Sequence, residues 1–144
     1  MNEQIIIKYF DDGLLPVEQH EKGDWIDLRA AEDVVLRPGD YHEIRLGVAM
    51  QLPIGYEAQV APRSSTFKKY GILQANSLGV IDHSYCGDSD EWRFPAYAVR
   101  PTMISKNDRI CQFRIVERQP NITFVKTEHL DNPDRGGFGS TGTQ

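Results

Sequence analysis

Ile44-Arg45-Leu46-Gly47-Val48-Ala49-Met50-Gln51-Leu52 places a large apolar side chain at every second position. A period of two is typical of a β-strand with one buried face. Shorter alternating runs occur at residues 56–60, 111–115 and 122–124, and turn sequences such as Pro53-Ile54-Gly55 punctuate them. Many short strands with regular turns predict an all-β fold, and we expect a single-domain, jelly-roll-like β-barrel or sandwich.

One segment departs from this pattern and looks helical. Ser64-Ser65-Thr66-Phe67-Lys68-Lys69-Tyr70-Gly71 begins with serines that could cap a helix and ends in a glycine. The last stretch, residues 131–144, is rich in Gly, Asp, Asn, Ser and Thr and has no periodicity. We therefore expect residues 1–130 to form the β domain and residues 131–144 to be a mobile, Gly-rich tail of that domain.

Composition narrows the class of protein. The chain has 144 residues and a net charge of −5, which fits one domain and does not favour general binding to nucleic acid or to anionic membranes. Two cysteines, Cys86 and Cys111, are interpreted as free thiols in a reducing compartment. The sequence shows neither a signal peptide nor an apolar run long enough to cross a membrane, so we predict a cytoplasmic, intracellular protein.

Gly79-Val80-Ile81-Asp82-His83-Ser84-Tyr85-Cys86-Gly87 carries the strongest chemical signal. Glycines bound a carboxylate and an aromatic ring, and they let the backbone fold tightly around a small ligand. Asp82 follows an apolar run and could act as a general base toward water, while Tyr85 could offer a flat face to a sugar. The alternatives are an Asp that caps a turn and a Tyr that fills a hairpin.

Pro62-Arg63-Ser64-Ser65 precedes the expected helix and has the chemistry of a phosphate site. A guanidinium matches a phosphate, and hydroxyls and free helix N–H groups add donors. The alternative is an ordinary capped surface helix. Asp27 and Gln112 are unremarkable alone, although Gln112 should point away from the apolar face formed by residues 111, 113 and 115.

The tail contains Gly137-Phe138-Gly139-Ser140-Thr141-Gly142, which matches the G-x-G-x-x-G pattern. A dinucleotide-binding fold would need a helix after this motif, and only Thr143 and Gln144 follow. Backbone N–H groups, two hydroxyls and the nearby Arg135 could instead wrap around phosphates. The alternative is a disordered tail without a ligand.

Taken in order, these segments resemble the trimeric deoxyuridine triphosphatases (dUTP diphosphatases, dUTPases) of the bacterial and phage type. The resemblance spans nearly the whole chain and rests on motifs that occur here as Asp27-Leu28-Arg29-Ala30-Ala31, Pro62-Arg63-Ser64-Ser65, Gly79 to Gly87, Asn107-Asp108-Arg109-Ile110-Cys111-Gln112 and Arg135 to Gly142.

The resemblance implies an enzyme that hydrolyses dUTP to dUMP and pyrophosphate, which limits uracil incorporation into DNA and supplies dUMP. Asp82 would activate the water that attacks the α-phosphate, and Tyr85 would lie beneath the deoxyribose. The remaining substrate-binding residues would be Arg63, Ser64, Ser65, Asn76, Val80, Ile81, Gly87, Gln112, Arg135, Phe138, Ser140 and Thr141.

The family also implies a cofactor and an assembly. Mg²⁺ would be held by the three phosphates and by water, with no direct protein ligand and with Asp27 contributing through water. A homotrimer would build each site from several subunits, and the tail would close a neighbour's site over dUTP.

Two departures from the family pattern matter. Arg135 and Phe138 are three residues apart, whereas the common tail places the arginine five residues before the phenylalanine. The segment after Tyr85, residues 88–95, is acidic and aromatic, and its Trp92 or Phe94 could replace Phe138 as the lid over uracil.

Two other functions compete with this one. A dCTP deaminase of the same fold would need a carboxylate placed to protonate cytosine, and none is apparent between Asp82 and Tyr85. A protein-binding regulator on the same scaffold is the other alternative, with the acidic residues 88–91 as the contact surface, and a solvated hairpin tip is the simpler interpretation of that segment.

Overall fold

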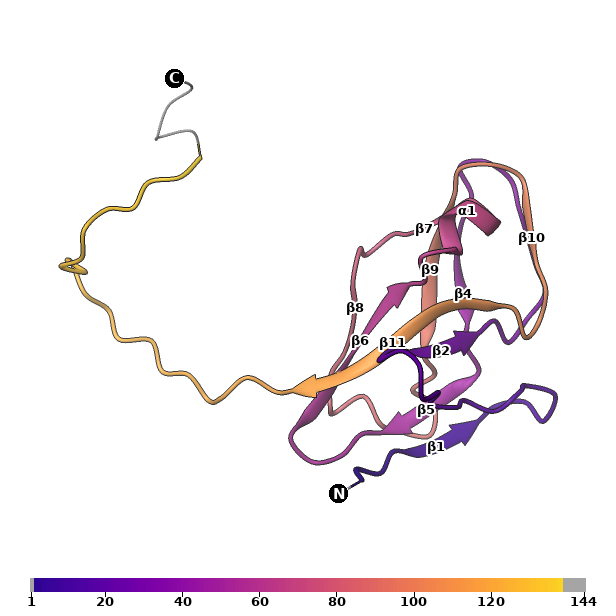
Figure 1. Cartoon of the computed structure of the whole chain (residues 1–144), viewed down its shortest axis with the longest axis horizontal. Helices are drawn as coiled ribbons and strands as arrows, with labels where there is room; N and C mark the ends of the chain where they lie inside the picture. Colours follow the sequence, from indigo (N-terminus) through magenta and orange to yellow (C-terminus); the bar gives the residue numbers. More distant parts are fainter. Residues whose placement is uncertain (1, 139–144) are drawn as a thin grey trace.

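The computed structural model describes residues 2–138, and almost all of its regular structure is β (Figure 1). The elements follow one another as β1 (Ile6–Tyr9), β2 (Ile26–Arg29), β3 (Val34–Leu36), β4 (Tyr41–Arg45), β5 (Val48–Gln51), β6 (Tyr56–Pro62), α1 (Thr66–Tyr70), β7 (Ile72–Gln74), β8 (Gly79–Ile81), β9 (Arg93–Ala98), β10 (Thr102–Ile104) and β11 (Arg109–Glu117).

The strands pair in antiparallel fashion into four sheets. The largest has the order β2-β11-β6-β8, the next has the order β4-β9-β7, and β1-β5 and β10-β3 are two-stranded. Among the described residues no sheet closes on itself. The prediction of an all-β, jelly-roll-like sandwich with one short helix is confirmed, whereas a closed barrel is not what the strands form.

One apolar core lies between the sheets because alternate side chains of each strand point inward. Ala58 and Val60 of β6 are buried, and so are Phe94, Ala96 and Ala98 of β9. The aromatic rings of this core meet edge to face: the centroids of Trp92 and Phe113 are 5.3 Å apart at an interplanar angle of 84°, a favourable geometry for an aromatic pair.

The alternating residues 44–52 are buried as predicted, but they do not form one strand. β4 ends at Arg45 and β5 begins at Val48, because Gly47 has a φ of +69° that interrupts the extended backbone. A Cβ on Gly47 would also lie 2.8 Å from the Ala31 side chain and 2.9 Å from that of Leu14. The glycine thus bends the chain where the core leaves no room for a side chain.

The helix is present where expected. Ser65 occupies the N-cap position, as predicted, but its side chain makes no capping hydrogen bond. The Thr66 hydroxyl bonds outside the helix: it accepts from the Arg63 N–H at 2.8 Å and donates to the Ile110 carbonyl at 2.9 Å, so it ties the start of the helix to the preceding turn and to β11. The end is as predicted, since Gly71 adopts a φ of +64° and its N–H bonds the Phe67 carbonyl.

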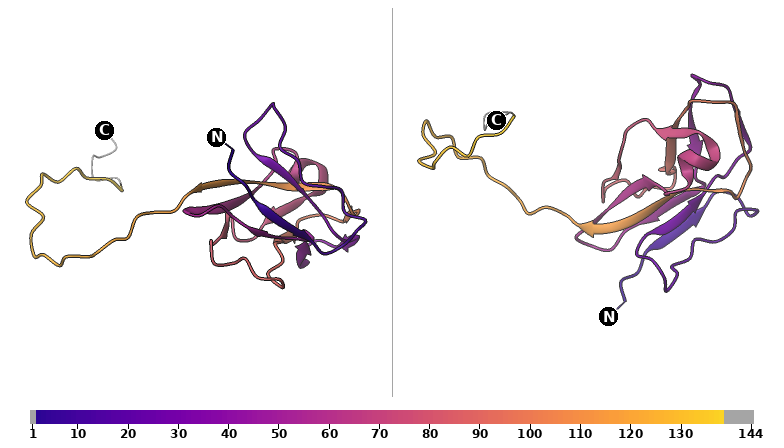
Figure 2. Two further views of the ribbon diagram at one scale, coloured as in Figure 1. Left: turned by 90° about the horizontal axis from the view of Figure 1, so that it is seen from below. Right: turned by 45° about the horizontal axis from the view of Figure 1, so that its top comes forward.

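The predicted strand at residues 122–124 is wrong. β11 is the last strand of the described chain, and Ile122 and Phe124 are 55% and 92% exposed. An alternating sequence forms a strand only where a partner strand and a core face are available, and here the chain leaves the body after β11 (Figures 1 and 2). Residues 131–138 carry no helix or strand and are mostly exposed, while their mobility stays a prediction.

Candidate active site

A pocket of about 470 Å³ opens where the segment after β7, strand β8 and the following turn meet strands β4 and β9. Four predicted substrate-binding residues line it: Asn76, Val80, Ile81 and Tyr85. The fold also brings in residues that the sequence reasoning did not select, namely Tyr41, Glu43, Ala75, Arg93 and Pro95. Glu91 and Trp92 line it too, although the sequence reasoning considered them for a contact surface and for a lid.

The pocket wall on β4 could have been found from the sequence. Tyr41, Glu43 and Arg45 alternate with His42 and Ile44, so they share one face of that strand. In the structure, the Tyr41 hydroxyl donates to the Glu43 carboxylate at 3.2 Å, and both side chains border the pocket. The signal that the sequence reasoning missed is therefore the row of polar side chains on one face of β4, opposite the face that carries the buried Ile44.

Asp82 is the first residue after β8 and lies beside the pocket. Its carboxylate accepts the Ser84 N–H at 2.9 Å and the Ser84 hydroxyl, and His83 Nδ1 is 3.4 Å away. The hydrogen bonds from Ser84 lower the pKa of Asp82 below its ordinary value. The side chain is 59% exposed, so Asp82 both caps the turn and presents an ionised carboxylate to solvent.

Tyr85 is held at both of its ends. Its N–H bonds the Asp82 carbonyl at 2.9 Å, and its hydroxyl donates to the Glu91 carbonyl at 2.9 Å. The residue is 38% exposed and borders the pocket, and partial burial raises the pKa of its hydroxyl. Gly87, also predicted to read the base, lies in the next turn and does not line this pocket.

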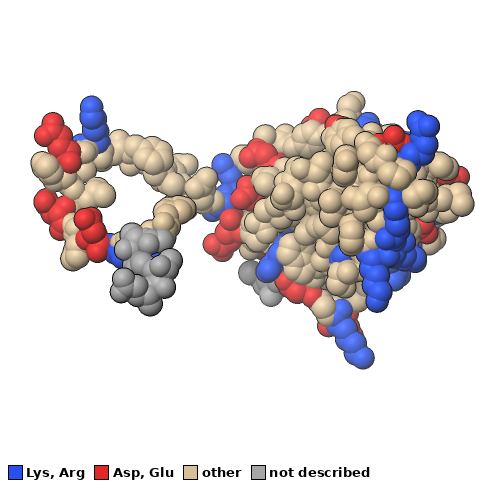
Figure 3. All heavy atoms as spheres, turned by 90° about the horizontal axis from the view of Figure 1, so that it is seen from above, with Lys and Arg blue, Asp and Glu red and all other residues tan. Residues whose placement is uncertain are grey.

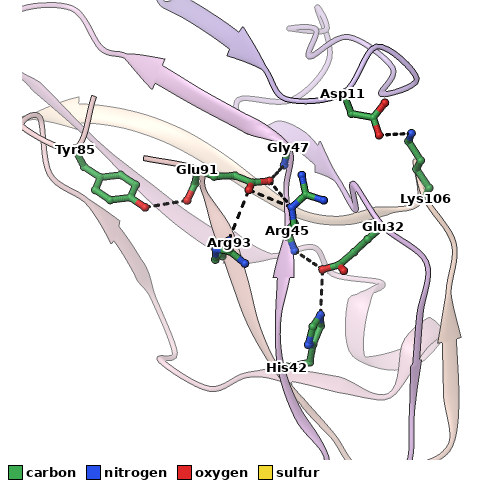
Figure 4. A network of polar contacts seen from close by, with 9 residues as sticks. All are labelled: Asp11, Glu32, His42, Arg45, Gly47, Tyr85, Glu91, Arg93 and Lys106. Atoms are coloured by element: carbon green, nitrogen blue, oxygen red, sulfur yellow. Dashed lines mark hydrogen bonds and ion pairs between the residues drawn. The ribbon is translucent and has the colours of Figure 1, made fainter. Parts of the chain in front are cut away.

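Glu91 belongs to the interior and not to an exposed acidic surface. It is 7% exposed, its carboxylate oxygens each lie 3.1 Å from Arg45 Nε, and one accepts the Gly47 N–H at 2.9 Å (Figure 4). The carboxylate raises the pKa of Arg45. The alternative contact surface at residues 88–91 is thus corrected in one respect: Glu91 faces the core, and Asp88 is the most exposed acidic residue of the segment.

The residues with phosphate chemistry form a second cluster. Arg63, just before α1, places Nε 3.0 Å from one oxygen of Asp27 on β2. Arg109 Nε lies 3.8 Å from the other oxygen. Gln112 points away from the core, as predicted, and donates to the Pro62 carbonyl at 3.0 Å. Asp27 therefore holds two guanidinium groups beside the start of the helix, where Ser64 and Ser65 lie.

The two clusters lie at opposite ends of β6. In the β6–β8 ladder Ala58 faces Ile81, the residue before Asp82, whereas Arg63 follows the far end of β6. The five steps along the chain from Ala58 to Arg63 span about 17 Å of extended backbone. The structure thus brings Asp82 together with the pocket, and Arg63 together with Gln112 and Asp27, but it does not unite the two groups within one chain.

The tail residues do not reach either cluster in this chain. Arg135 and Phe138 lie in the extended segment beyond β11, and Phe138 is fully exposed. Ser140 and Thr141 lie outside the described residues.

On the face shown in Figure 3, Lys and Arg side chains gather on the side of the body away from the tail, so basic groups are clustered despite the net charge of −5.

The alternative lid is wrong. Trp92 and Phe94 are both 0% exposed and belong to the hydrophobic core. Trp92 borders the pocket floor while its ring packs on Phe113. Neither ring can swing over a ligand without opening the core, which leaves Phe138 as the aromatic side chain proposed for that role.

Comparison with known proteins identifies the chain. The sequence profile of the dUTPase family matches residues 16–142. The SPbeta prophage-derived deoxyuridine 5′-triphosphate nucleotidohydrolase YosS of Bacillus subtilis is 57% identical over 141 residues, which cover 98% of this chain and 99% of that protein. The chain belongs to the dUTPase family.

Further dUTPases agree with this assignment. The deoxyuridine 5′-triphosphate nucleotidohydrolase of Thermobifida fusca is 35% identical, over 96% of this chain and 79% of that protein. A solved dUTPase of the Staphylococcus aureus phage phi11 has a TM-score of 0.77 at 18% identity, covering 90% of this chain and 99% of that one. A dUTPase of phage 80alpha has a TM-score of 0.80 at 22% identity, covering 97% and 99%. These two structures confirm the fold.

Between residues 2 and 138, no three His, Cys, Asp or Glu side chains gather as a metal-binding group. Within the same range, no helix has the length and apolar character needed to cross a membrane.

Proposed function

We propose that this dUTPase-family chain hydrolyses dUTP to dUMP and pyrophosphate, with Asp82 as the general base. The observation that carries the assignment is the exposed Asp82 carboxylate beside a pocket lined by Asn76 and Tyr85. The 57% identity to a protein named as a deoxyuridine 5′-triphosphate nucleotidohydrolase supports the substrate.

The chemistry follows from an ionised carboxylate. Asp82 accepts a proton from a water molecule as the water oxygen forms a bond to the α-phosphorus. The bond from that phosphorus to the bridging oxygen breaks, and pyrophosphate leaves with the electron pair. A positioned general base contributes about 10²–10⁴-fold to rate. The lowered pKa of Asp82 keeps it in the accepting form at neutral pH.

Selection of base and sugar takes place in the pocket. Asn76 and the backbone of Val80 and Ile81 would pair with uracil, and the tight wall would exclude the methyl group of thymine. Tyr85 would pack beneath the deoxyribose, where a 2′-hydroxyl would clash. The pocket lining of these four residues supports this arrangement.

The phosphate groups would be bound by the second cluster. Arg63, Ser64, Ser65 and Gln112 supply cationic and neutral donors, and the tail adds Arg135, Ser140 and Thr141 with Phe138 over the base. The ion pair with Asp27 keeps the Arg63 guanidinium in a fixed orientation. Such preorganised donors stabilise charge that develops on a phosphate during attack.

Mg²⁺ is the cofactor that we propose. Both Asp27 oxygens face guanidinium groups, so this carboxylate fits a water-mediated contact and does not fit direct coordination. The ion would therefore be held by the three phosphates and by water. When bound, it would reduce the negative charge that repels the attacking oxygen.

We propose that the active enzyme is a homotrimer whose subunits share their sites. The separation of Asp82 and Arg63 along β6 supports this, since the two groups must act on one triphosphate. A neighbouring copy that presents its Arg63 cluster, or its tail, to the Asp82 pocket would complete the site.

The test is pyrophosphate release from dUTP, dTTP, dCTP and UTP in the presence of Mg²⁺. We expect release from dUTP to be far faster than from the other three nucleotides, and we expect it to fall about 10²–10⁴-fold in Asp82→Asn. Asp88→Asn is the matched control, because it makes the same change at an exposed residue six positions later. Absence of release from dUTP in the native protein would overturn the proposal.

A further inference from the structure

The hydroxyl of Tyr85 is bonded to the backbone of a residue whose own side chain is locked into the core. The Glu91 carbonyl accepts that hydroxyl at 2.9 Å, and the Glu91 side chain is 8% exposed (Figure 4). A buried carboxylate is costly unless it is paired and hydrogen-bonded. Its presence beside the pocket therefore calls for a structural or functional reason.

The Glu91 carboxylate receives donors from the connection between β4 and β5. Arg45 Nε lies 3.1 Å from both oxygens, and the Gly47 N–H donates at 2.9 Å. Arg93 Nη2 adds a cation 3.7 Å away. These contacts cross 44 to 46 residues of sequence, so they tie the Glu91 backbone to a separate part of the fold.

The loop between Tyr85 and Glu91 has few such ties. Its internal hydrogen bonds are local: Asp90 N–H bonds the Gly87 carbonyl, and the Gly87 N–H bonds the Asp90 carboxylate. Residues 86–89 are exposed, and Lys8 is the residue outside the loop that reaches Asp88. The carbonyl against which the Tyr85 ring is aligned is therefore fixed in two ways: the Trp92 N–H of the same peptide donates to the Val48 carbonyl at 2.8 Å, and the Glu91 carboxylate holds its own side of the residue through Arg45 and Gly47.

We propose that Glu91, held by Arg45, is a positioning residue that sets the discrimination between deoxyribose and ribose through Tyr85. This inference rests on the proposed function, in which Tyr85 packs against the sugar. A ring held at its hydroxyl cannot retreat from a 2′-hydroxyl, whereas a ring released from the Glu91 carbonyl can. The Asp82 carboxylate has its polar contacts with Ser84 and His83 of its own turn, so sugar selectivity changes more than turnover of dUTP.

The experiment compares kcat/KM for dUTP and for UTP in the native protein and in Glu91→Gln, which keeps the shape and removes the charge. We expect the dUTP-to-UTP ratio to fall about tenfold, the usual scale for loss of one charge-assisted hydrogen bond, while kcat for dUTP changes less than this ratio. Asp88→Asn, an exposed acid on the same loop, should leave the ratio unchanged. An unchanged ratio in folded Glu91→Gln would overturn the proposal.

A double-mutant cycle separates positioning from general stability. Tyr85→Phe removes the hydroxyl, so Glu91→Gln should lower selectivity little further in that background. Full additivity of the two changes would show that Glu91 acts elsewhere and would contradict the proposal. Arg45→Lys, which keeps the charge and loses Nε, serves as a milder variant should Glu91→Gln not fold, and it should lower the ratio in the same direction.

Different results contradict the proposed function and the positioning role of Glu91. If the native protein releases no pyrophosphate from dUTP, the proposed function fails. If the native protein prefers dUTP and folded Glu91→Gln or Arg45→Lys keeps the native dUTP-to-UTP ratio, the positioning role alone fails.

Discussion

Mixing two inactive variants tests whether the site is shared between chains. Asp82→Asn removes the general base, and Arg63→Ala removes the guanidinium held by Asp27. Ala58 of β6, paired with the residue before Asp82, lies five residues before Arg63, which follows the end of β6, and this separation is about 17 Å of extended chain. No side chain bridges that span, so a site built within one chain cannot contain both groups. Each homogeneous variant is therefore expected to lack most dUTPase activity.

The expected recovery can be calculated from the shared-site geometry. In a cyclic assembly formed from equal amounts of the two variants, one half of the sites receive an intact Asp82. One half of those also receive an intact Arg63 from the neighbouring subunit, so about a quarter of the sites are complete. Co-refolding the variants and measuring pyrophosphate release from dUTP should restore about a quarter of native activity.

Two controls make this result decisive. Mixing the folded variants without unfolding tests whether subunits exchange, and co-refolding either variant with a chain carrying both substitutions should restore nothing. Activity of the mixture no higher than that of the separate variants would refute the reasoning, because it would mean that each site is built within a single chain.

Three further predictions concern single residues. Ser84→Ala removes a hydrogen bond that lowers the pKa of Asp82, so this pKa rises and the acid limb of the kcat/KM profile moves to higher pH; an unmoved limb would contradict this. A thiol reagent should titrate exposed Cys86 in the native protein and also Cys111 after denaturation, because burial shields the Cys111 thiol and raises its pKa. Trp92→Ala should lower the free energy of unfolding by about 3–5 kcal/mol, because it removes a buried aromatic ring. Denaturant titration at fixed protomer concentration measures this change. Unchanged stability would contradict the core position of Trp92 and would again allow it to act as a lid.

Local sequence patterns predicted much of the fold and part of the site. The alternation at residues 44–52 correctly marks buried positions, since side-chain direction along an extended chain is a local property. Gly71 ends the helix because a left-handed cap favours glycine. Asn76 and Tyr85 lie close in sequence to Asp82, on the two sides of the short strand β8, so this segment carries both to one pocket and places Asp82 beside it.

Local sequence patterns gave wrong predictions where strand pairing or burial depends on residues far away in the sequence. Residues 122–124 alternate as a strand does, yet no strand of the described chain pairs with them. Trp92 and Phe94 lie in an acidic, polar stretch that suggests a surface, but the pairing of β9 with β4 turns Phe94 inward. Burial of a side chain depends on what covers it, and the sequence around the residue does not contain that information.

The sequence by itself determined the class of fold, the carboxylate that serves as the proposed base and the family. The tertiary structure alone decided that Glu91 and Arg45 meet across 46 residues, that Asp27 pairs with Arg63, and that Asp82 and Arg63 lie at opposite ends of β6. The physical reason is that period and motif are properties of neighbouring residues, whereas these contacts depend on strand order and register. Register is set by how the whole chain buries its apolar faces, and it cannot be read from any one segment.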